Sequence, residues 1–183
     1  MDNAIERNIN LFFQDPRIEP VIPGKLSVLY LLRRDVMHCF DHNIILFPAT
    51  MTILAGIDLL AKFYAGNDKT GQVGARFKNL IKRYFSNISN DDAIVLYQLR
   101  NALLHSFGLF SRDNNKDYSF ALGPASSFIN RVNDMYYINP WILRNQFEEA
   151  IQRYRSNLDT DSTLCAYFQA MFPRYGTMDL TPA

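Results

Sequence analysis

Arg100 and His105 are the two residues whose types and spacing most clearly suggest chemistry in this sequence. They stand where a helical pattern of apolar residues ends, so we expect both at the edge of a hydrophobic core. A charged group in such a place needs a partner, a ligand or a function. Histidine ordinarily titrates near neutral pH and can transfer protons, whereas a guanidinium stays charged and donates paired hydrogen bonds to phosphate oxygens. The pair is therefore suited to breaking a phosphodiester bond in RNA.

The roles of the individual side chains follow from that chemistry. RNA carries its own nucleophile, the ribose 2′-hydroxyl, so His105 would move the proton and Arg100 would hold the scissile phosphate and its transition state. Asn101, which both donates and accepts hydrogen bonds, would position the ribose or the imidazole. The products would be 2′,3′-cyclic phosphate and 5′-hydroxyl ends, with no metal and no other cofactor. DNA, which lacks the 2′-hydroxyl, would not be cleaved.

Residues 100–105 read RNALLH, which resembles the arginine-x4-6-histidine motif of the HEPN superfamily. The helix-like segment 56–64 also resembles a helix of that family, and the resemblance covers roughly residues 25–110. It implies an all-α domain with a metal-independent RNA-cleaving site, usually completed by a second copy in a homodimer. On an ideal helix Arg100 and His105 would point about 140° apart, so we expect either a break in the helix near residues 104–106 or a second chain that completes the site. The resemblance also implies a toxin or phage-defence effector, with an antitoxin or inhibitor protein as a partner. Some toxins of the family carry a modifiable tyrosine where this chain has Phe107, so control by that modification is not expected here.

Two further residues are expected to support the motif. Asp58 lies between the apolar residues Ile57 and Leu59, where it would orient a motif side chain or pair with Lys62 one helical turn later. Tyr97 lies close to the motif in the sequence and is the second supporting candidate.

A local excess of basic residues precedes the motif, although the formal net charge of the chain is only +1. Residues 76–100 contain five basic and two acidic side chains. Lys78, Lys82 and Arg83 are therefore expected to bind the RNA backbone, with an ordinary solvated helix face as the alternative.

Other functions are left open by the same residues. An arginine and a histidine at a helix end can simply cap carbonyl groups, which would leave a catalytically inactive HEPN-like module that binds RNA or protein. Asp35, His38 and His42 form the third possibility. At spacings of three and four residues they share one helix face, where imidazoles and a carboxylate would bind a divalent transition metal and make the protein a metalloenzyme.

The sequence predicts a mainly α fold, as a four- to five-helix up-down bundle with a small β-hairpin after the motif helix. An irregular arm, residues 1–24, is expected from Pro16, Pro20, Pro23 and Gly24, and it precedes a single domain, residues 25–183. Helical periodicity covers the following segments: 25–40, 48–64, 73–84, a stretch from about 90 to the motif, 140–154 and 161–171. Gly66 is expected to end the second of these helices, and the polar residues 89–92 to cap the start of the helix that leads to the motif. The hairpin is expected from the apolar runs 107–111 and 118–122, and 128–138 is a candidate for one more strand.

Composition favours a soluble cytoplasmic protein. A chain of 183 residues with 48% hydrophobic residues can bury a substantial core. Its two cysteines, Cys39 and Cys165, form no disulfide framework, and the N-terminal residues do not resemble a signal peptide. The longest uncharged run, residues 42–57, is shorter than a membrane helix requires. No membrane association is expected.

Overall fold

The computed structural model describes residues 3–20, 25–41 and 45–179. The described helices are α1 (Asn3–Phe12), α2 (Val28–Asp41), α3 (Leu46–Ala65), η1 (Thr70–Gln72, a 3-10 turn), α4 (Val73–Tyr84), α5 (Asn90–Ser106), α6 (Pro140–Leu158) and α7 (Ser162–Tyr175). The strands are β1 (Lys25–Ser27), β2 (Phe110–Asp113), β3 (Lys116–Leu122), β4 (Ile129–Val132), β5 (Met135–Ile138) and β6 (Thr177–Asp179). The mainly helical fold is therefore as predicted, although the described residues form seven α-helices instead of the four to five expected. Helices α2 to α7 match the six periodic segments.

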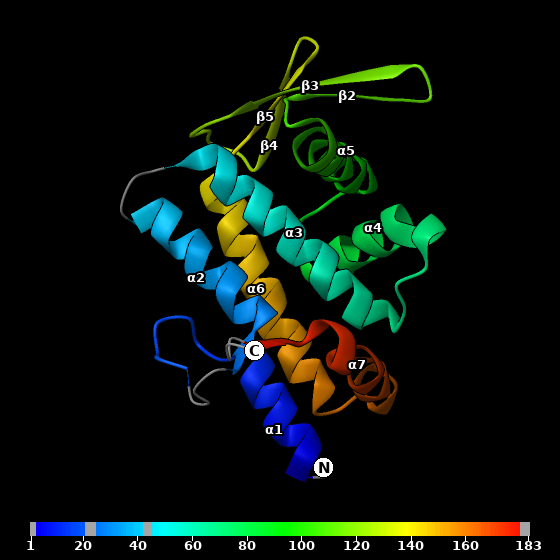
Figure 1. Cartoon of the computed structure of the whole chain (residues 1–183). Coiled ribbons are helices and arrows are strands. Elements are labelled where there is room, and N and C mark those ends of the chain that lie inside the picture. The colour runs from blue at the N-terminus through cyan, green and yellow to red at the C-terminus, as the bar shows by residue number, and fades with distance from the viewer. Residues whose placement is uncertain (1–2, 21–24, 42–44, 180–183) are drawn as a thin grey trace.

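The apolar helix α3 lies at the centre of the molecule and contacts α2, α4, α5, α6 and α7 (Figure 1). It begins with Pro48 in its first turn and ends at Gly66, whose left-handed φ of 63° closes the helix without a steric penalty. By length and composition α3 is the one described helix that could cross a membrane. Its contacts with five other helices explain that composition, because a helix that is apolar on all sides belongs in a core.

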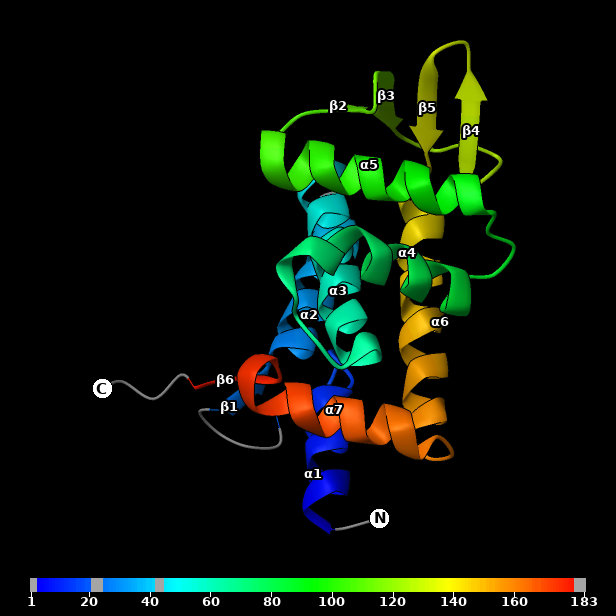
Figure 2. The same ribbon diagram turned by 90° about the vertical axis from the view of Figure 1, so that its right-hand side faces the viewer.

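The helices do not form a simple up-down bundle. Figure 2 shows α2, α3 and α6 running roughly alongside one another, with α4, α5 and α7 lying across them. Helices crossing in both directions can cover α3 from several sides, which a single layer of parallel and antiparallel neighbours would not do. The predicted up-down arrangement is thus not confirmed.

Helix α5 connects the helical layer to the sheet and carries the candidate motif. Ser89 caps its start, accepting a hydrogen bond from the Asp92 backbone N–H while the Asp92 carboxylate accepts one from the Ser89 N–H. Such a reciprocal capping box fixes where the helix begins. At the other end the helix stops at Phe107, which adopts a left-handed conformation. The position of the motif therefore follows from a strong start signal and a sharp stop, with 17 helical residues between them.

A four-stranded sheet with strand order β2-β3-β5-β4 replaces the single predicted hairpin. The predicted hairpin is present as β2 and β3, and a second antiparallel hairpin is formed by β4 and β5. The two hairpins join through a parallel pairing of β3 with β5, in which Phe120 lies opposite Tyr136. The buried residues Tyr118, Phe120 and Tyr136 join the core on one face of the sheet. Pairing between strands so far apart in sequence leaves no short-range signal.

The N-terminal segment, residues 1–24, is not the irregular arm that the sequence predicted, because its described part contains helix α1. Ile9 and Phe12 are fully buried, and the Phe12 ring lies 4.4 Å from that of Phe63. Pro16 and Pro20, which suggested irregular structure, come only after this helix has ended. The apolar residues before them decide the local structure. Further along, β1 pairs with β6, an antiparallel contact that joins two distant parts of the chain.

Candidate functional site

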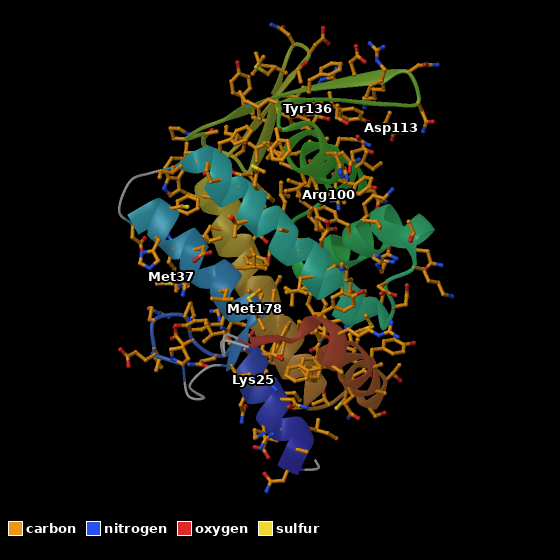
Figure 3. The ribbon with its side chains drawn as sticks, in the orientation of Figure 1. Lys25, Met37, Arg100, Asp113, Tyr136 and Met178 are labelled. Atoms are coloured by element: carbon orange, nitrogen blue, oxygen red, sulfur yellow. The ribbon has the colours of Figure 1, made fainter. Side chains whose placement is uncertain are left out.

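Arg100 on α5 forms an ion pair with Asp58 on α3. Its Nε and Nη2 atoms donate to the same oxygen of Asp58, at 2.6 and 2.5 Å. The Arg100 side chain is 12% exposed and that of Asp58 17% exposed, so the pair lies at the edge of the core, as expected from their apolar neighbours. Figure 3 marks Arg100 on α5. The predicted contact between Asp58 and a motif side chain is present.

The third nitrogen of the Arg100 guanidinium points toward the rest of the motif. Nη1 donates to the side-chain oxygen of Asn101 at 3.2 Å and is in contact with Nε2 of His105. A guanidinium can only donate, so Nε2 of His105 is the acceptor in this contact. His105 itself is exposed to solvent. One arginine therefore joins a partly buried carboxylate to an exposed imidazole.

The contact within one chain corrects an expectation based on ideal helix geometry. Five residues along an α-helix place two Cβ atoms about 140° apart around the axis, which predicted either a broken helix or a second chain. Helix α5 continues unbroken to Ser106, and Arg100 still reaches His105. The ideal angle describes where side chains start, whereas the long arginine side chain extends across the helix surface. A partner chain is not needed for this contact.

Basic side chains surround Asp58. Burial raises the pKa of its carboxyl above the ordinary value, and the nearby positive charges of Arg100, Lys62 and Arg76 oppose that effect. Arg76 is itself buried and donates to the Lys69 carbonyl at 2.6 Å. The site thus has three cations and two carboxylates, because Asp68 also lies near Lys62, and its remaining positive charge would favour an anion such as a phosphate.

Tyr97 packs against α4 instead of joining the Arg100 cluster. Its ring lies 5.7 Å from that of Phe77, and a side chain at Gly74 would come within 2.8 Å of it. The absence of a Cβ at Gly74 lets α4 and α5 approach closely there. Tyr97 therefore packs α5 against α4, and the structure does not bring it to the motif as a supporting residue.

The basic residues of α4 lie toward the opposite end of α5 from His105. Lys78 and Lys82 line a groove between α4 and the start of α5, which Asn90 and Ile94 help to form, and Arg83 is exposed nearby on α4. At 1.5 Å per residue, Asn90 and His105 are separated by roughly 22 Å along the helix. Lys78 is nearer to the motif, because its Nζ lies 5.8 Å from the centre of the Tyr97 ring, one helical turn before Arg100. The basic residues therefore extend along α5 from its start toward Arg100 and do not contact His105 in any interaction found among the described residues. An extended strand of RNA is long enough to contact both.

The candidate metal residues of α2 are only partly described. Asp35 is exposed and accepts a hydrogen bond from Arg34 at 2.9 Å, while His38 is exposed on the same helix. His42 lies outside the described residues, so the three cannot be examined together. Among the residues that the structure does describe, no group of three histidine, cysteine, aspartate or glutamate side chains could hold a metal ion.

Two polar clusters were missed from the sequence. Buried Gln98 donates to Asp113 at 3.0 Å and accepts from Ser111 at 2.7 Å, which ties α5 to the strand that follows the motif. Figure 3 marks Asp113 at the sheet. Arg33, only 4% exposed, donates through Nε and Nη2 to Glu148, which lies 115 residues away. Gln98 and Arg33 each stand as a polar residue within an apolar periodic segment, which was the available sequence signal. That signal does not indicate which residue each of them contacts.

The Arg33 pair lies in a wide groove between α2 and α6. Its walls also carry Arg144 and Arg153, which pair with Asp41 at 3.2 Å and with Glu149 at 3.0 Å. The charges in this groove are therefore balanced by one another, unlike the basic surroundings of Asp58.

Comparison with known proteins gave no match to a family model, to a curated protein or to a solved structure. The function of the Arg100 site is accordingly argued from its own geometry.

Proposed function

We propose that this protein is a metal-independent endoribonuclease of the HEPN type, which cleaves RNA to 2′,3′-cyclic phosphate and 5′-hydroxyl ends. The observation that carries the proposal is the contact of Arg100 with the exposed imidazole of His105, while Asp58 holds the other side of the guanidinium. A phosphate-binding cation and a proton-transfer group thus meet at the protein surface. These are the two functions that transesterification of RNA requires of an enzyme.

The resting hydrogen bonds suggest how substrate would activate the site. A scissile phosphate that binds Arg100 competes for Nη1, which frees Nε2 of His105 to accept the proton of the 2′-hydroxyl. The 2′-oxygen then bonds to phosphorus, the bond from phosphorus to the 5′-oxygen breaks, and that oxygen takes up a proton. Arg100 offsets the extra negative charge that develops on the phosphate oxygens. Asn101 is placed to orient the arginine or the ribose.

The proposal includes the partners that the motif resemblance implies. In a homodimer related by a two-fold axis, both histidines would approach one cleft, so that one could act as base and the partner copy's as acid. The protein would act on RNA in the cytoplasm as a toxin or defence effector, restrained by an antitoxin or inhibitor protein. The mainly helical fold supports the proposal only at the level of fold class.

A second candidate function is a catalytically inactive module that binds RNA or protein. The observation in its favour is that all three nitrogens of the Arg100 guanidinium already have partners within the chain: Asp58 for Nε and Nη2, Asn101 and His105 for Nη1. In such a module Arg100 would only hold α5 against α3. The metalloenzyme based on Asp35, His38 and His42 is a third candidate, which chelation separates from the other two.

The test is cleavage of a mixed pool of single-stranded and structured RNA in EDTA. Wild type should produce cyclic-phosphate ends, and Arg100→Ala and His105→Ala should each lose at least about 100-fold in rate. Arg34→Ala and His38→Ala are matched controls on α2 that should retain activity. Cleavage that needs a divalent metal and is lost in His38→Ala would support the metalloenzyme instead. RNA binding without cleavage by wild type would support the inactive module.

The composite site has its own test. Mixing the Arg100→Ala and His105→Ala chains should restore part of the activity if residues of two chains complete one site. Because each pair is already in contact within one chain, no restoration would indicate that each chain works alone.

A further inference from the structure

Phe107, two residues after His105, has a conformation and an exposure that folding does not favour. Its φ is 47° and its side chain is 75% exposed, more than any other large apolar side chain in the described residues. Residues with a Cβ are disfavoured in the left-handed region, where helix ends usually place glycine. A glycine does follow, but Gly108 has no positive φ, so the phenylalanine takes the strained position.

The backbone hydrogen bond that ends α5 does not depend on the aromatic ring of Phe107. The Gly108 N–H donates to the Ala102 carbonyl at 3.1 Å, which closes α5 and needs only the left-handed turn at position 107. A glycine would make the same turn without strain and without leaving an apolar ring in water. Since strain of this kind is concentrated at functional sites, the ring calls for a role outside the fold.

The position of the ring suggests that role. Its Cα can be no more than about 7 Å from that of His105, because only Ser106 lies between them. A nucleotide whose phosphate contacts Arg100 and His105 would therefore have a neighbouring base within reach of an exposed aromatic face. The exposed residues nearest in the chain are mixed: His105 and Ser106 are polar, and Phe110, at the start of β2, is apolar and 49% exposed. An aromatic ring with polar groups beside it suits a nucleotide, which presents a base to stack on next to its polar sugar and phosphate.

We propose that Phe107 stacks on an unpaired base next to the scissile phosphate, so that the substrate is single-stranded or looped RNA. This inference rests on the proposed function of the same site. Phe107 is a positioning residue, since its ring contributes neither a proton nor charge to the reaction. Loss of base stacking on an aromatic side chain corresponds to roughly a 5- to 150-fold loss of affinity. Paired bases are already stacked on one another, so duplex RNA would gain nothing from Phe107.

The experiment compares Phe107→Leu, Phe107→Gly and Phe107→Trp with wild type on single-stranded and duplex RNA. Leucine keeps an apolar side chain but removes the aromatic face, and glycine removes strain as well. Both should raise KM for single-stranded RNA by about 5- to 150-fold with little change in kcat. Phe107→Trp, which keeps an aromatic face, should have a KM close to that of wild type. Tyr137→Leu, which removes an exposed aromatic ring from β5, is the matched control and should behave as wild type.

Binding by the His105→Ala background separates this inference from the proposed catalysis. An oligonucleotide carrying the fluorescent base 2-aminopurine should be quenched on binding to His105→Ala, and less so when Phe107→Leu is added. If wild type does not cleave but this quenching depends on Phe107, catalysis is refuted and base stacking is supported. If wild type cleaves and the Phe107 variants have unchanged KM and quenching, base stacking is overturned while the ribonuclease stands. Loss of a wild-type dimer in Phe107→Leu would make the ring a subunit contact and would also overturn it, as would the absence of RNA binding by any variant.

Discussion

Substitutions at Phe107 should separate stability from function, because the strain there can be removed without removing a core contact. A left-handed conformation costs a residue with a Cβ about 1–2 kcal/mol, and glycine loses about 0.5–1 kcal/mol more backbone entropy on folding than alanine. Phe107→Gly should therefore be more stable than Phe107→Ala by about 0.5–1 kcal/mol. The ring is 75% exposed, so its truncation forfeits only about 0.5 kcal/mol of apolar burial in either variant. The glycine variant should thus be at least as stable as wild type, and the alanine variant less stable.

Urea denaturation measures these free energies of unfolding directly, and the melting temperatures should differ by about 1–4 °C for a chain of this size. The adjacent residue Ser106 provides the control. Ser106 is exposed and helical, so Ser106→Ala should be more stable than Ser106→Gly, the opposite order from position 107.

Two results would refute the reasoning about Phe107. Equal stability of the glycine and alanine variants would mean that the backbone at position 107 is not held in the left-handed region. A glycine variant well below wild type would mean that the ring makes packing contacts that its exposure does not reveal. A glycine variant that is stable but binds single-stranded RNA weakly would instead show that the strain is kept for the ligand.

Two further predictions concern charged pairs. Glu148→Gln should lower the free energy of unfolding by about 2 kcal/mol, because it leaves the buried guanidinium of Arg33 without its carboxylate. Asp35→Asn, which breaks an exposed pair, should lower it by less than about 1 kcal/mol in the same chemical denaturation experiment. Equal losses would contradict the packing of α2 on α6. Burial raises the pKa of the Asp58 carboxyl in the folded protein above its ordinary value of 3.8. The protonation of Asp58 therefore stabilises the fold fully below pH 3.8, and this stabilisation is lost as the pH rises through the pKa of the folded state. Wild type should therefore lose stability relative to Asp58→Asn as the pH rises from 3.8 toward neutrality, which unfolding curves recorded at several pH values would show. The Asp58→Asn variant should also cleave RNA more slowly than wild type, because Arg100 is no longer anchored, and cleavage rates would measure this.

Local signals predicted the helices well. Periodic apolar residues, the stop at Gly66 and the capping residues from Ser89 depend on neighbours within a few positions, and the structure confirms α2 to α7 from them. The N-terminal helix α1 was missed because the later prolines were given more weight than Ile9 and Phe12. The parallel pairing of β3 with β5 had no local signal, since its register depends on packing against the rest of the molecule.

The contact of Asp58 with the motif was predictable from the sequence, whereas the contact within the motif was not. The apolar flanks of Asp58 indicated a partly buried acid in need of a partner, and that partner is Arg100. The contact of Arg100 with His105 was not predicted, because the prediction followed the directions of the Cβ atoms on an ideal helix and ignored the length of the arginine side chain. The left-handed backbone of Phe107 could not be anticipated, since a phenylalanine is not the residue that such a turn favours.

Arginine is the side chain that this arrangement of partners requires at position 100. Its planar fork presents Nε and Nη2 to Asp58 at the edge of the core while Nη1 faces Asn101 and His105, so that one rigid group spans the distance from the partly buried acid to the exposed imidazole. A lysine has a single flexible ammonium group and could not hold a fixed orientation toward both ends. The position of the positive charge next to His105 therefore depends on the packing of α3 against α5. A substrate phosphate would exchange the hydrogen bonds of Nη1 more readily than those to Asp58, because the Asp58 side of the guanidinium is largely shielded from solvent.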